Sequence, residues 1–320
     1  MQKNTLKLLL FSSLMLSSCQ GRTYTPEDYR CEVSFTDDFQ IMFMTDLHLE
    51  VEADFKKEYE HLNKMITSAS PDLIVLTGDT FLHATKDIVR SFFNVMDSYR
   101  IPYCFTYGNH DLQGDYDYYY INERLKASPV ALFADYADDE LTGLTNYYVN
   151  VKKDGKSLYR LYIIDSNSYY SGGVTYDYDI IHQDQLDHVK AIDSFENDDA
   201  VGLAFFHIPL LQYTSAYEAY QQDSSIGKGE NREACCPGYK ESGAYDCFKE
   251  VGIKACFCGH DHINYSDIMY QNEMILDYGI KGTDLCYWDD DLIGYKLITL
   301  TSDTSAFGLD SIEYRWVAYE

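Results

Sequence analysis

The chain alternates short apolar runs with longer segments in which apolar residues recur every three or four positions. Continuous apolar runs are typical of strands buried on both faces, and the three-to-four spacing is typical of amphipathic helices. The pattern predicts strands in the ranges 39–46, 71–79, 101–111, 158–166, 200–207 and 253–262. It predicts helices in the ranges 54–69, 85–99, 182–196 and 243–251. Strand and helix therefore alternate, which favours an α/β fold built on parallel strands.

Polar side chains follow five of these predicted strands. The five endings are Asp46-Leu47-His48, Gly78-Asp79, Gly108-Asn109-His110-Asp111, His207 and Gly259-His260-Asp261-His262. Because ligands bind at the carboxyl ends of parallel strands, we expect these side chains to lie close together. Mixed carboxylate, amide and imidazole donors suit zinc, iron or manganese better than calcium. The endings therefore predict a metal site.

The same endings, in this order, resemble the DxH, GD, GNHD, lone His and GHxH signature of the calcineurin-like metallophosphoesterases. The stretches IIDS (163–166) and HIPL (207–210) and the helix near Asp184 resemble the purple-acid-phosphatase-like branch of that family. The resemblance covers roughly residues 39–300. It implies an α/β fold of the four-layer α/β/β/α type, in which two mixed β-sheets are flanked by helices.

The resemblance also implies a binuclear site, with two divalent or trivalent metal ions about 3.5 Å apart. The first ion would be held by Asp46, His48 and His262, the second by Asn109, His207 and His260, and Asp79 would bridge both. The family's reaction is hydrolysis of phosphoric esters by in-line attack of a metal-bridging hydroxide. His110 would steady the transition state and protonate the leaving oxygen. Asp111 would orient the ring of His110.

The chain departs from the pattern that it resembles just after Asp79. The protein-dephosphorylating branch has Asp-Arg shortly after the GD motif, whereas here Thr80-Phe81-Leu82 follows. The acid partner that His110 has in that branch is therefore missing. Purple acid phosphatases bind ferric iron through a tyrosine at the position that Leu82 occupies here. The identity of the metals, iron, zinc or manganese, therefore stays open.

The N-terminus predicts export. Lys3 and Lys7 precede an apolar run too short to span a bilayer, and Leu16-Ser17-Ser18-Cys19 resembles a bacterial lipobox. We predict a signal peptide at residues 1–18, lipidation of Cys19, a polar tether at 19–37 and a single phosphoesterase domain at 38–320. This places the protein in the cell envelope, outside the cytoplasm, on a membrane anchor. An ordinary signal peptide cleaved nearby is the alternative.

Charge and cysteine content refine the picture. The formal net charge of −27 argues against binding of a nucleic acid polymer, and a small phosphoester substrate would need positive charge from bound cations. In an oxidising compartment, Cys235, Cys236 and Cys247 are the cysteines most expected to form disulfides. Cys256 and Cys258 lie beside His260 and His262 in CFCGHDH, which taken alone suggests a thiolate zinc site. The other strand ends instead predict that both cysteines belong to a buried strand.

Specificity is the least predictable feature. The tyrosine-rich stretches 115–123 and 166–179 are predicted as loops at the metal rim, where their rings could contact substrate or simply cover apolar surface. A nucleotide- or phospholipid-specific hydrolase is the nearest alternative, and a noncatalytic surface-binding lipoprotein is the alternative from another class. Four histidines are predicted to lie outside the site: His61, His83, His182 and His188.

Overall fold

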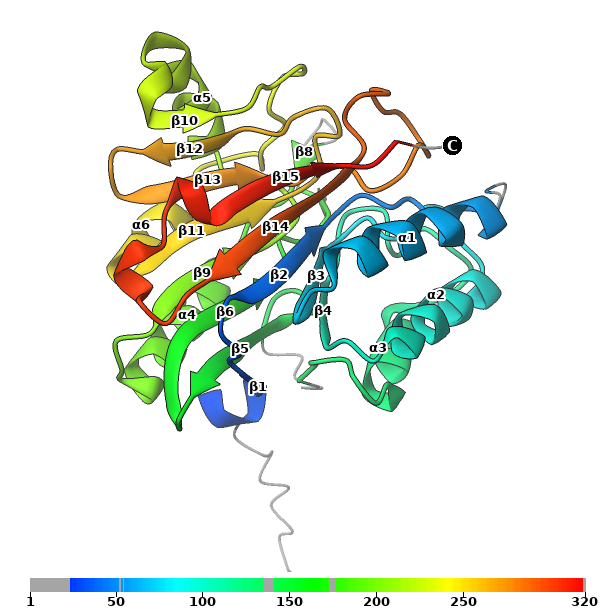
Figure 1. The fold of residues 1–320 in the computed structure, drawn as a ribbon, viewed down its shortest axis with the longest axis horizontal. Helices are drawn as coiled ribbons and strands as arrows, with labels where there is room; N and C mark the ends of the chain where they lie inside the picture. Colours follow the sequence, from blue (N-terminus) through cyan, green and yellow to red (C-terminus); the bar gives the residue numbers. More distant parts are fainter. Residues whose placement is uncertain (1–23, 52, 54, 135–140, 173–176, 319–320) are drawn as a thin grey trace, which may run out of the picture.

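The structure is a computed structural model that describes residues 24–51, 53, 55–134, 141–172 and 177–318. Two large β-sheets pack face to face, and helices cover both outer faces (Figure 1). This confirms the four-layer arrangement that the resemblance implied. The predicted signal peptide and Cys19 lie outside the described residues.

The first sheet is mixed and has eight strands. In spatial order they are β1 (Arg30–Ser34), β5 (Asn146–Lys153), β6 (Lys156–Ile164), β9 (Val201–Phe205), β11 (Ile253–Cys258), β13 (Met274–Tyr278), β12 (Asp267–Tyr270) and β10 (Gly227–Lys228). The central strands β6, β9, β11 and β13 run parallel to one another. Their carboxyl ends therefore share one edge of the sheet.

The second sheet has five strands. In spatial order they are β15 (Ile312–Trp316), β14 (Gly294–Leu300), β2 (Phe39–Met44), β3 (Leu73–Thr77) and β4 (Tyr103–Thr106). The strands β2, β3 and β4 are parallel, while β14 runs antiparallel to β2. A short hairpin of β7 (Tyr169–Tyr170) and β8 (Asp177–Tyr178) forms a separate two-stranded sheet.

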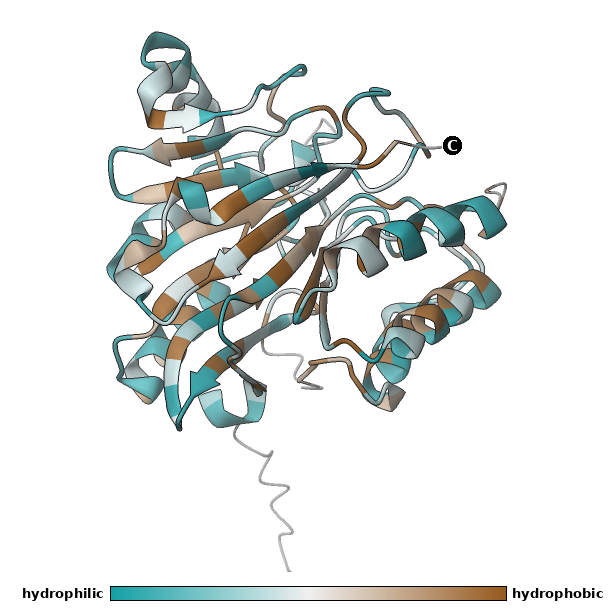
Figure 2. Ribbon diagram, viewed as in Figure 1, coloured by the Kyte–Doolittle hydropathy of each residue, from teal (hydrophilic) through white to brown (hydrophobic). Residues whose placement is uncertain are grey.

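Two cores hold the four layers together. The helices α1 (Phe55–Ala69), α2 (Lys86–Tyr99) and α3 (Tyr118–Ala127) pack on the outer face of the five-stranded sheet. The helices α4 (Gln183–Glu196), α5 (Gln212–Gln222) and α6 (Ala244–Glu250) share a core with the eight-stranded sheet and the inner face of the other sheet. Alternation along β2 explains this, because Ile41 and Phe43 face the inner core while Met42 and Met44 face the helices. Figure 2 shows the apolar residues gathered on the central strands.

The predicted helices all form within two residues of their expected bounds, and the six predicted strands form as β2, β3, β4, β6, β9 and β11. The prediction of a tether through residue 37 is wrong, since β1 pairs in parallel with β5 at the edge of the sheet. The prediction of a loop at 115–123 is also wrong from Tyr118 onward. There α3 begins, and the side chain of Asp117 caps it by accepting a hydrogen bond from the Tyr120 amide.

The cysteines differ partly from expectation. Every cysteine in the described ranges has a free thiol, so the predicted disulfides at Cys235, Cys236 and Cys247 are absent from this structure. Cys256 and Cys258 are fully buried in β11, as predicted. Among the described residues, none of the helices combines the length and apolarity needed to cross a bilayer.

Candidate dimetal centre

The predicted donors gather at the carboxyl edges of both sheets. Asp46, Asp79 and His207 each lie two residues beyond the end of a strand, namely β2, β3 and β9. Asn109 follows β4, and His260 and His262 follow β11. Because these strands are parallel within each sheet and the sheets face each other, the endings converge on one place.

Three donors form the first group. The ring atoms His48 Nε2 and His262 Nε2 lie 2.9 Å apart. Asp46 Oδ1 lies 3.5 Å from the first and 3.4 Å from the second. All three side chains are buried, and their donor atoms lie within 4.8 Å of one another. This is the set that the sequence predicted for the first metal.

A second group lies beside the first. Asp79, His207 and His260 bring their donor atoms within 4.8 Å of one another. His207 Nε2 lies 3.2 Å from Asp79 Oδ2 and 3.2 Å from Asn109 Oδ1. Asp79 Oδ2 is also only 3.7 Å from His48 Nε2, in the first group. Asp79 therefore stands between the two groups, where a bridging ligand would stand.

The carboxylates themselves fit metal ions. Asp46 Oδ1 and Asp79 Oδ2 are buried atoms that accept no hydrogen bond in the described structure. Their other oxygens are held by the backbone, since Asp46 Oδ2 accepts from the His260 amide and Asp79 Oδ1 accepts from the His110 amide. A buried carboxylate oxygen without a partner is costly unless a cation neutralises it. In each carboxylate, one oxygen is therefore fixed by a backbone amide and the other is available to bind a metal ion.

Backbone carbonyls orient two of the histidines. His207 Nδ1 lies 2.8 Å from the carbonyl oxygen of Thr77, and His262 Nδ1 lies 2.9 Å from that of Tyr287. A carbonyl only accepts, so Nδ1 donates its proton and Nε2 is the nitrogen left to bind a metal. This is the usual outer contact of a metal-binding histidine. Neither carbonyl could be recognised from the sequence, because both contacts join residues far apart in the chain.

The electrostatics of the centre favour a positive charge. Burial disfavours a charged ring, yet the nearby carboxylates of Asp79 and Asp46 raise the pKa of His207 to about 10. The pKa of Asp46 is held well below its usual range despite burial, chiefly by His207. Lys281 is buried as well, and its Nζ donates to the carbonyl of Asp46. Desolvation lowers the pKa of this amine to about 8.

His110 lies at the open side of the centre. Its side chain is 28% exposed, and its Nε2 lies 4.0 Å from Asp79 Oδ2. The contact that the sequence predicted between its ring and Asp111 is not made. The Asp111 carboxylate instead accepts hydrogen bonds from three backbone amides, those of Gly108, Asp79 and Phe81. The ring of His110 contacts Gln113, which the sequence analysis missed although it lies only three residues away.

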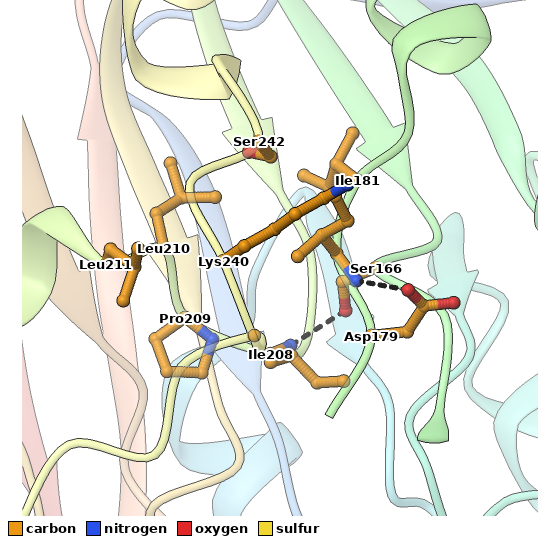
Figure 3. Close-up of a pocket in the computed structure, with 11 residues that line it drawn as sticks. Ser166, Asp179, Ile181, Ile208, Pro209, Leu210, Leu211, Lys240 and Ser242 are labelled. Atoms are coloured by element: carbon orange, nitrogen blue, oxygen red, sulfur yellow. Dashed lines mark hydrogen bonds between the residues drawn. The ribbon is translucent and has the colours of Figure 1, made fainter. Parts of the chain in front are cut away.

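The segment behind His207 is rigidly built. Ser166 Oγ accepts hydrogen bonds from the amides of His207 and Ile208. Figure 3 shows the small pocket there, with the Lys240 side chain lying across it toward Ile181. Its volume of about 10 Å³ is close to that of one water position, too small for a substrate. The pocket is therefore a packing gap beneath the His207 loop.

A larger pocket adjoins the centre on the side of Asn109. It has a volume of about 330 Å³, and its lining residues are Tyr107, Gly108, Asn109, Leu112, Gly143, Leu144, Asp165, Asn167 and Ser168. The only ionisable carboxylate in this lining, that of Asp165, already accepts hydrogen bonds from two backbone amides. The lining contains no lysine or arginine. The pocket thus offers space for a small uncharged group.

Aromatic residues stand at the rim. The Tyr169 hydroxyl accepts a hydrogen bond from Asn109 Nδ2, and this tyrosine belongs to the second stretch that was predicted as a rim loop. Tyr178 meets the ring of His260 edge-on at 4.2 Å. On the other side, Tyr287 stacks on His262 at 4.0 Å. The four histidines predicted to lie outside the site belong to neither donor group.

Comparison with known proteins agrees with this geometry. The sequence model of the family "Calcineurin-like phosphoesterase" matches residues 39–264. Over 71% of its length the chain is 28% identical to a protein of Arabidopsis thaliana named "Probable inactive purple acid phosphatase 29", of which the match covers 61%. Over 76% of its length it is 26% identical to "Phosphatase DCR2" of Saccharomyces cerevisiae, of which the match covers 48%. The chain therefore spans less than two thirds of these curated relatives.

Solved structures show the same fold. A dimetal phosphatase from Danio rerio superposes with a TM-score of 0.55 at 10% identity, covering 83% of this chain and 94% of the other. GAP50, described as the anchor in the inner membrane complex of Plasmodium, superposes with a TM-score of 0.52 at 14% identity, covering 89% and 86%. At such low identity, the likeness speaks for the fold alone.

Proposed function

Because the chain belongs to the calcineurin-like phosphoesterase family, we propose that it is a metal-dependent hydrolase of phosphoric esters. The observation that carries the proposal is the position of Asp79 Oδ2, a buried oxygen without a hydrogen bond that lies 3.7 Å from His48 Nε2 and 3.2 Å from His207 Nε2. Two cations held by the donor groups would supply an acidified water as nucleophile and neutralise the phosphoryl oxygens. The donor set, rich in imidazole, suits iron, zinc or manganese.

The protein's own groups would divide the remaining work. Asp46 and Asp79 fix the charge of the centre, while the carbonyls of Thr77 and Tyr287 hold two imidazoles in the tautomer that binds metal. His110, at the open side, has its Nε2 free to donate a proton to the leaving oxygen. This division supports hydrolysis by direct displacement at phosphorus, without a covalent intermediate on the protein.

The substrate that this arrangement favours is a small phosphoester, monoester or diester. The pocket of about 330 Å³ begins at Asn109 and runs beside Leu112, on the same turn that carries His110. A group bound there would stand next to the residue that protonates the leaving oxygen. The absence of lysine and arginine from the lining favours an uncharged leaving alcohol over one that bears further phosphates.

We propose also that the protein works outside the cytoplasm on a lipid anchor at Cys19. The support is the sequence of residues 1–19, with two lysines, a short apolar run and a lipobox-like ending. The first element that the structure describes is the 3-10 helix Pro26–Tyr29, and the residues between Cys19 and this helix would span roughly 20 Å at full extension. A domain on so short a linker would remain close to the membrane.

The competing function is a noncatalytic binding protein that has kept the fold. The word "inactive" in the names of the Arabidopsis relatives makes this alternative concrete. Against it, each donor position of the predicted set is filled here by a side chain able to bind metal, and these side chains converge in two buried groups. Retained donors in ligand geometry favour a working centre.

The experiment is hydrolysis of 4-nitrophenyl phosphate and its bis ester by protein that lacks residues 1–19 and is loaded with iron, zinc or manganese. We expect turnover by the wild type and its loss, by at least about 10³-fold, in Asp79→Ala and in His207→Ala. Gln222→Leu, at the exposed end of α5, is the control. Activity that survives in both alanine variants would refute the mechanism, and metal binding without turnover of any ester would favour the noncatalytic alternative.

A further inference from the structure

His110 has a partner that the family pattern does not provide. His110 Nδ1 lies 2.8 Å from Oε1 of Gln113, within one turn of the same loop. The segment after Asp79, where one branch of the family supplies an acid, reads Thr80-Phe81-Leu82 here and contains no acid. We propose that Gln113 is the positioning residue of His110 and takes over the role of the missing acid. This inference rests on the proposed function, since it concerns protonation of the leaving group.

The contact leaves one ring nitrogen for chemistry. With Nδ1 facing Gln113, the other nitrogen, Nε2, faces the centre at 4.0 Å from Asp79 Oδ2. The amide oxygen of Gln113 accepts the proton on Nδ1, so that Nε2 is the atom that exchanges a proton with substrate. The backbone amide of His110 is bound to Asp79 Oδ1, which fixes the base of the side chain as well. His110 is therefore held at its backbone amide and at Nδ1 of its ring.

Gln113 is itself fixed by its backbone. Its amide donates to the carbonyl of His110, and its own carbonyl lies 3.2 Å from His83 Nδ1. The next residue is Gly114, where a Cβ atom would overlap the carbonyl of Ala84 and the ring of Tyr116. The absence of a side chain at Gly114 lets the turn dock closely on the loop after β3. A glutamine whose backbone is so constrained can hold a ring in place.

Asp111 has a different task, although it is closer to His110 in sequence. Its two carboxylate oxygens are occupied by the amides of Gly108, Asp79 and Phe81. These bonds tie the loop after β3 to the loop after β4, so the carboxylate is not available to the imidazole. Gln113 is thus the side chain that hydrogen-bonds to Nδ1 of the His110 ring.

The role predicts a dependence on the leaving group. Protonation by His110 matters little for 4-nitrophenolate, which leaves readily as an anion, and matters greatly for an alkoxide. We therefore expect Gln113→Leu to lower kcat/KM for an alkyl phosphate by about 10²-fold and for 4-nitrophenyl phosphate by less than about threefold. Gln113→Glu, which keeps an acceptor at the same reach, should retain most of the activity on both esters.

A double-mutant cycle completes the test. In a His110→Ala background, Gln113→Leu should cause no further loss on the alkyl ester, because the residue that it positions is gone. Metal content and melting temperature are measured for each variant. Gln113→Met serves as a second variant that lacks the hydrogen-bond acceptor, and Gln222→Leu is the control.

Two results would overturn the inference. One is an equal loss on both esters in Gln113→Leu and Gln113→Met at normal metal content, and the other is full additivity of the losses in the double variant. If instead the metal-loaded wild type hydrolyses neither ester, the proposed function fails and the inference fails with it. The two failures are therefore distinguishable.

Discussion

Single residues at this centre adopt backbone angles that few side chains tolerate. Asp46, His48, Asp79 and His260 have φ values of 55°, 48°, 47° and 79°, in the left-handed region. Such conformations cost about 1–3 kcal/mol each and persist where surrounding contacts determine them. Here, hydrogen bonds between the loop after β2 and the loop after β3 determine these conformations, since the amide of His48 donates to the carbonyl of Asp79. The strain is consistent with a site that aims four donors at a common point.

A test at this scale is Gly259→Ala. A Cβ atom at Gly259 would overlap Thr45 Oγ1 and Asp46 Oδ2. Because both of these atoms belong to side chains, the Asp46 carboxylate would have to move. We expect loss of the metal held by the first donor group and a fall in kcat of about 10²-fold, as for other small displacements of catalytic groups. Metal analysis and steady-state kinetics measure both.

The matched control is Gly308→Ala, since a Cβ atom there would have no neighbour within 4 Å. Normal metal content in Gly259→Ala would show that the Asp46 carboxylate can shift without consequence, contrary to the rigid geometry described above.

At the scale of elements, the sequence predicts best what is buried on both faces. The strands β2, β3 and β11 read as continuous apolar runs and were predicted, together with the donors at their ends. β1 was missed because its sequence RCEVS looks polar, although it pairs with β5 at the sheet edge. β12 and β14 were missed for a related reason. Each carries a buried charged residue, Asp267 in β12 and Lys296 in β14, and the two form an ion pair between the sheets that the sequence alone does not reveal.

The same distinction applies to the site. The donors could be predicted because each follows its strand by two to four residues. The carbonyls of Thr77 and Tyr287 could not, because a backbone atom leaves no trace in residue type and the two contacts join residues 130 and 25 positions apart. Gln113 lies between these cases: its spacing from His110 suits a turn, but many residues at such a spacing make no contact at all.

The buried charges between β12, β13 and β14 make a pH-dependent prediction. Asp277 lies beside Asp267 and 3.0 Å from Lys296 Nζ, with Tyr314 and Lys228 nearby. Burial, and then repulsion from Asp267, raises the pKa of Asp277 well above its usual range. The folded protein therefore binds a proton that the unfolded chain releases near pH 4.

The sign of the effect follows from that proton. Stability is greatest below the unfolded pKa of Asp277 and falls as pH rises toward the folded pKa, by up to about 1.4 kcal/mol per pH unit. Asp277→Asn, which cannot ionise, should flatten this slope. Urea unfolding between pH 5 and 8 measures it, with the exposed Asp310→Asn as control. An unchanged slope in Asp277→Asn would mean that Lys296 and Lys228 keep Asp277 charged in the folded state.

For the whole molecule, the centre joins the two sheets. Each donor group takes side chains from both, with Asp46 and His48 from the five-stranded sheet facing His262 from the eight-stranded one. In the second group, Asp79 faces His207 and His260 in the same way. A cation bound in either group would therefore link the carboxyl edges of the sheets, in addition to the shared apolar core. Catalysis and global stability should depend on the same ions.

Metal removal tests this link. We expect chelation to lower the melting temperature of the whole domain in one cooperative step, because an ion at 100 times its dissociation constant stabilises the folded state by about 2.7 kcal/mol. His260→Ala and His262→Ala should each lose the ion of a different group and retain the other, as measured by elemental analysis. Cys256→Ala with Cys258→Ala should retain both ions, since these thiols are buried within β11. If the double cysteine variant loses metal while still folded, CFCGHDH is a thiolate site after all, and the two sheets are joined by their core alone.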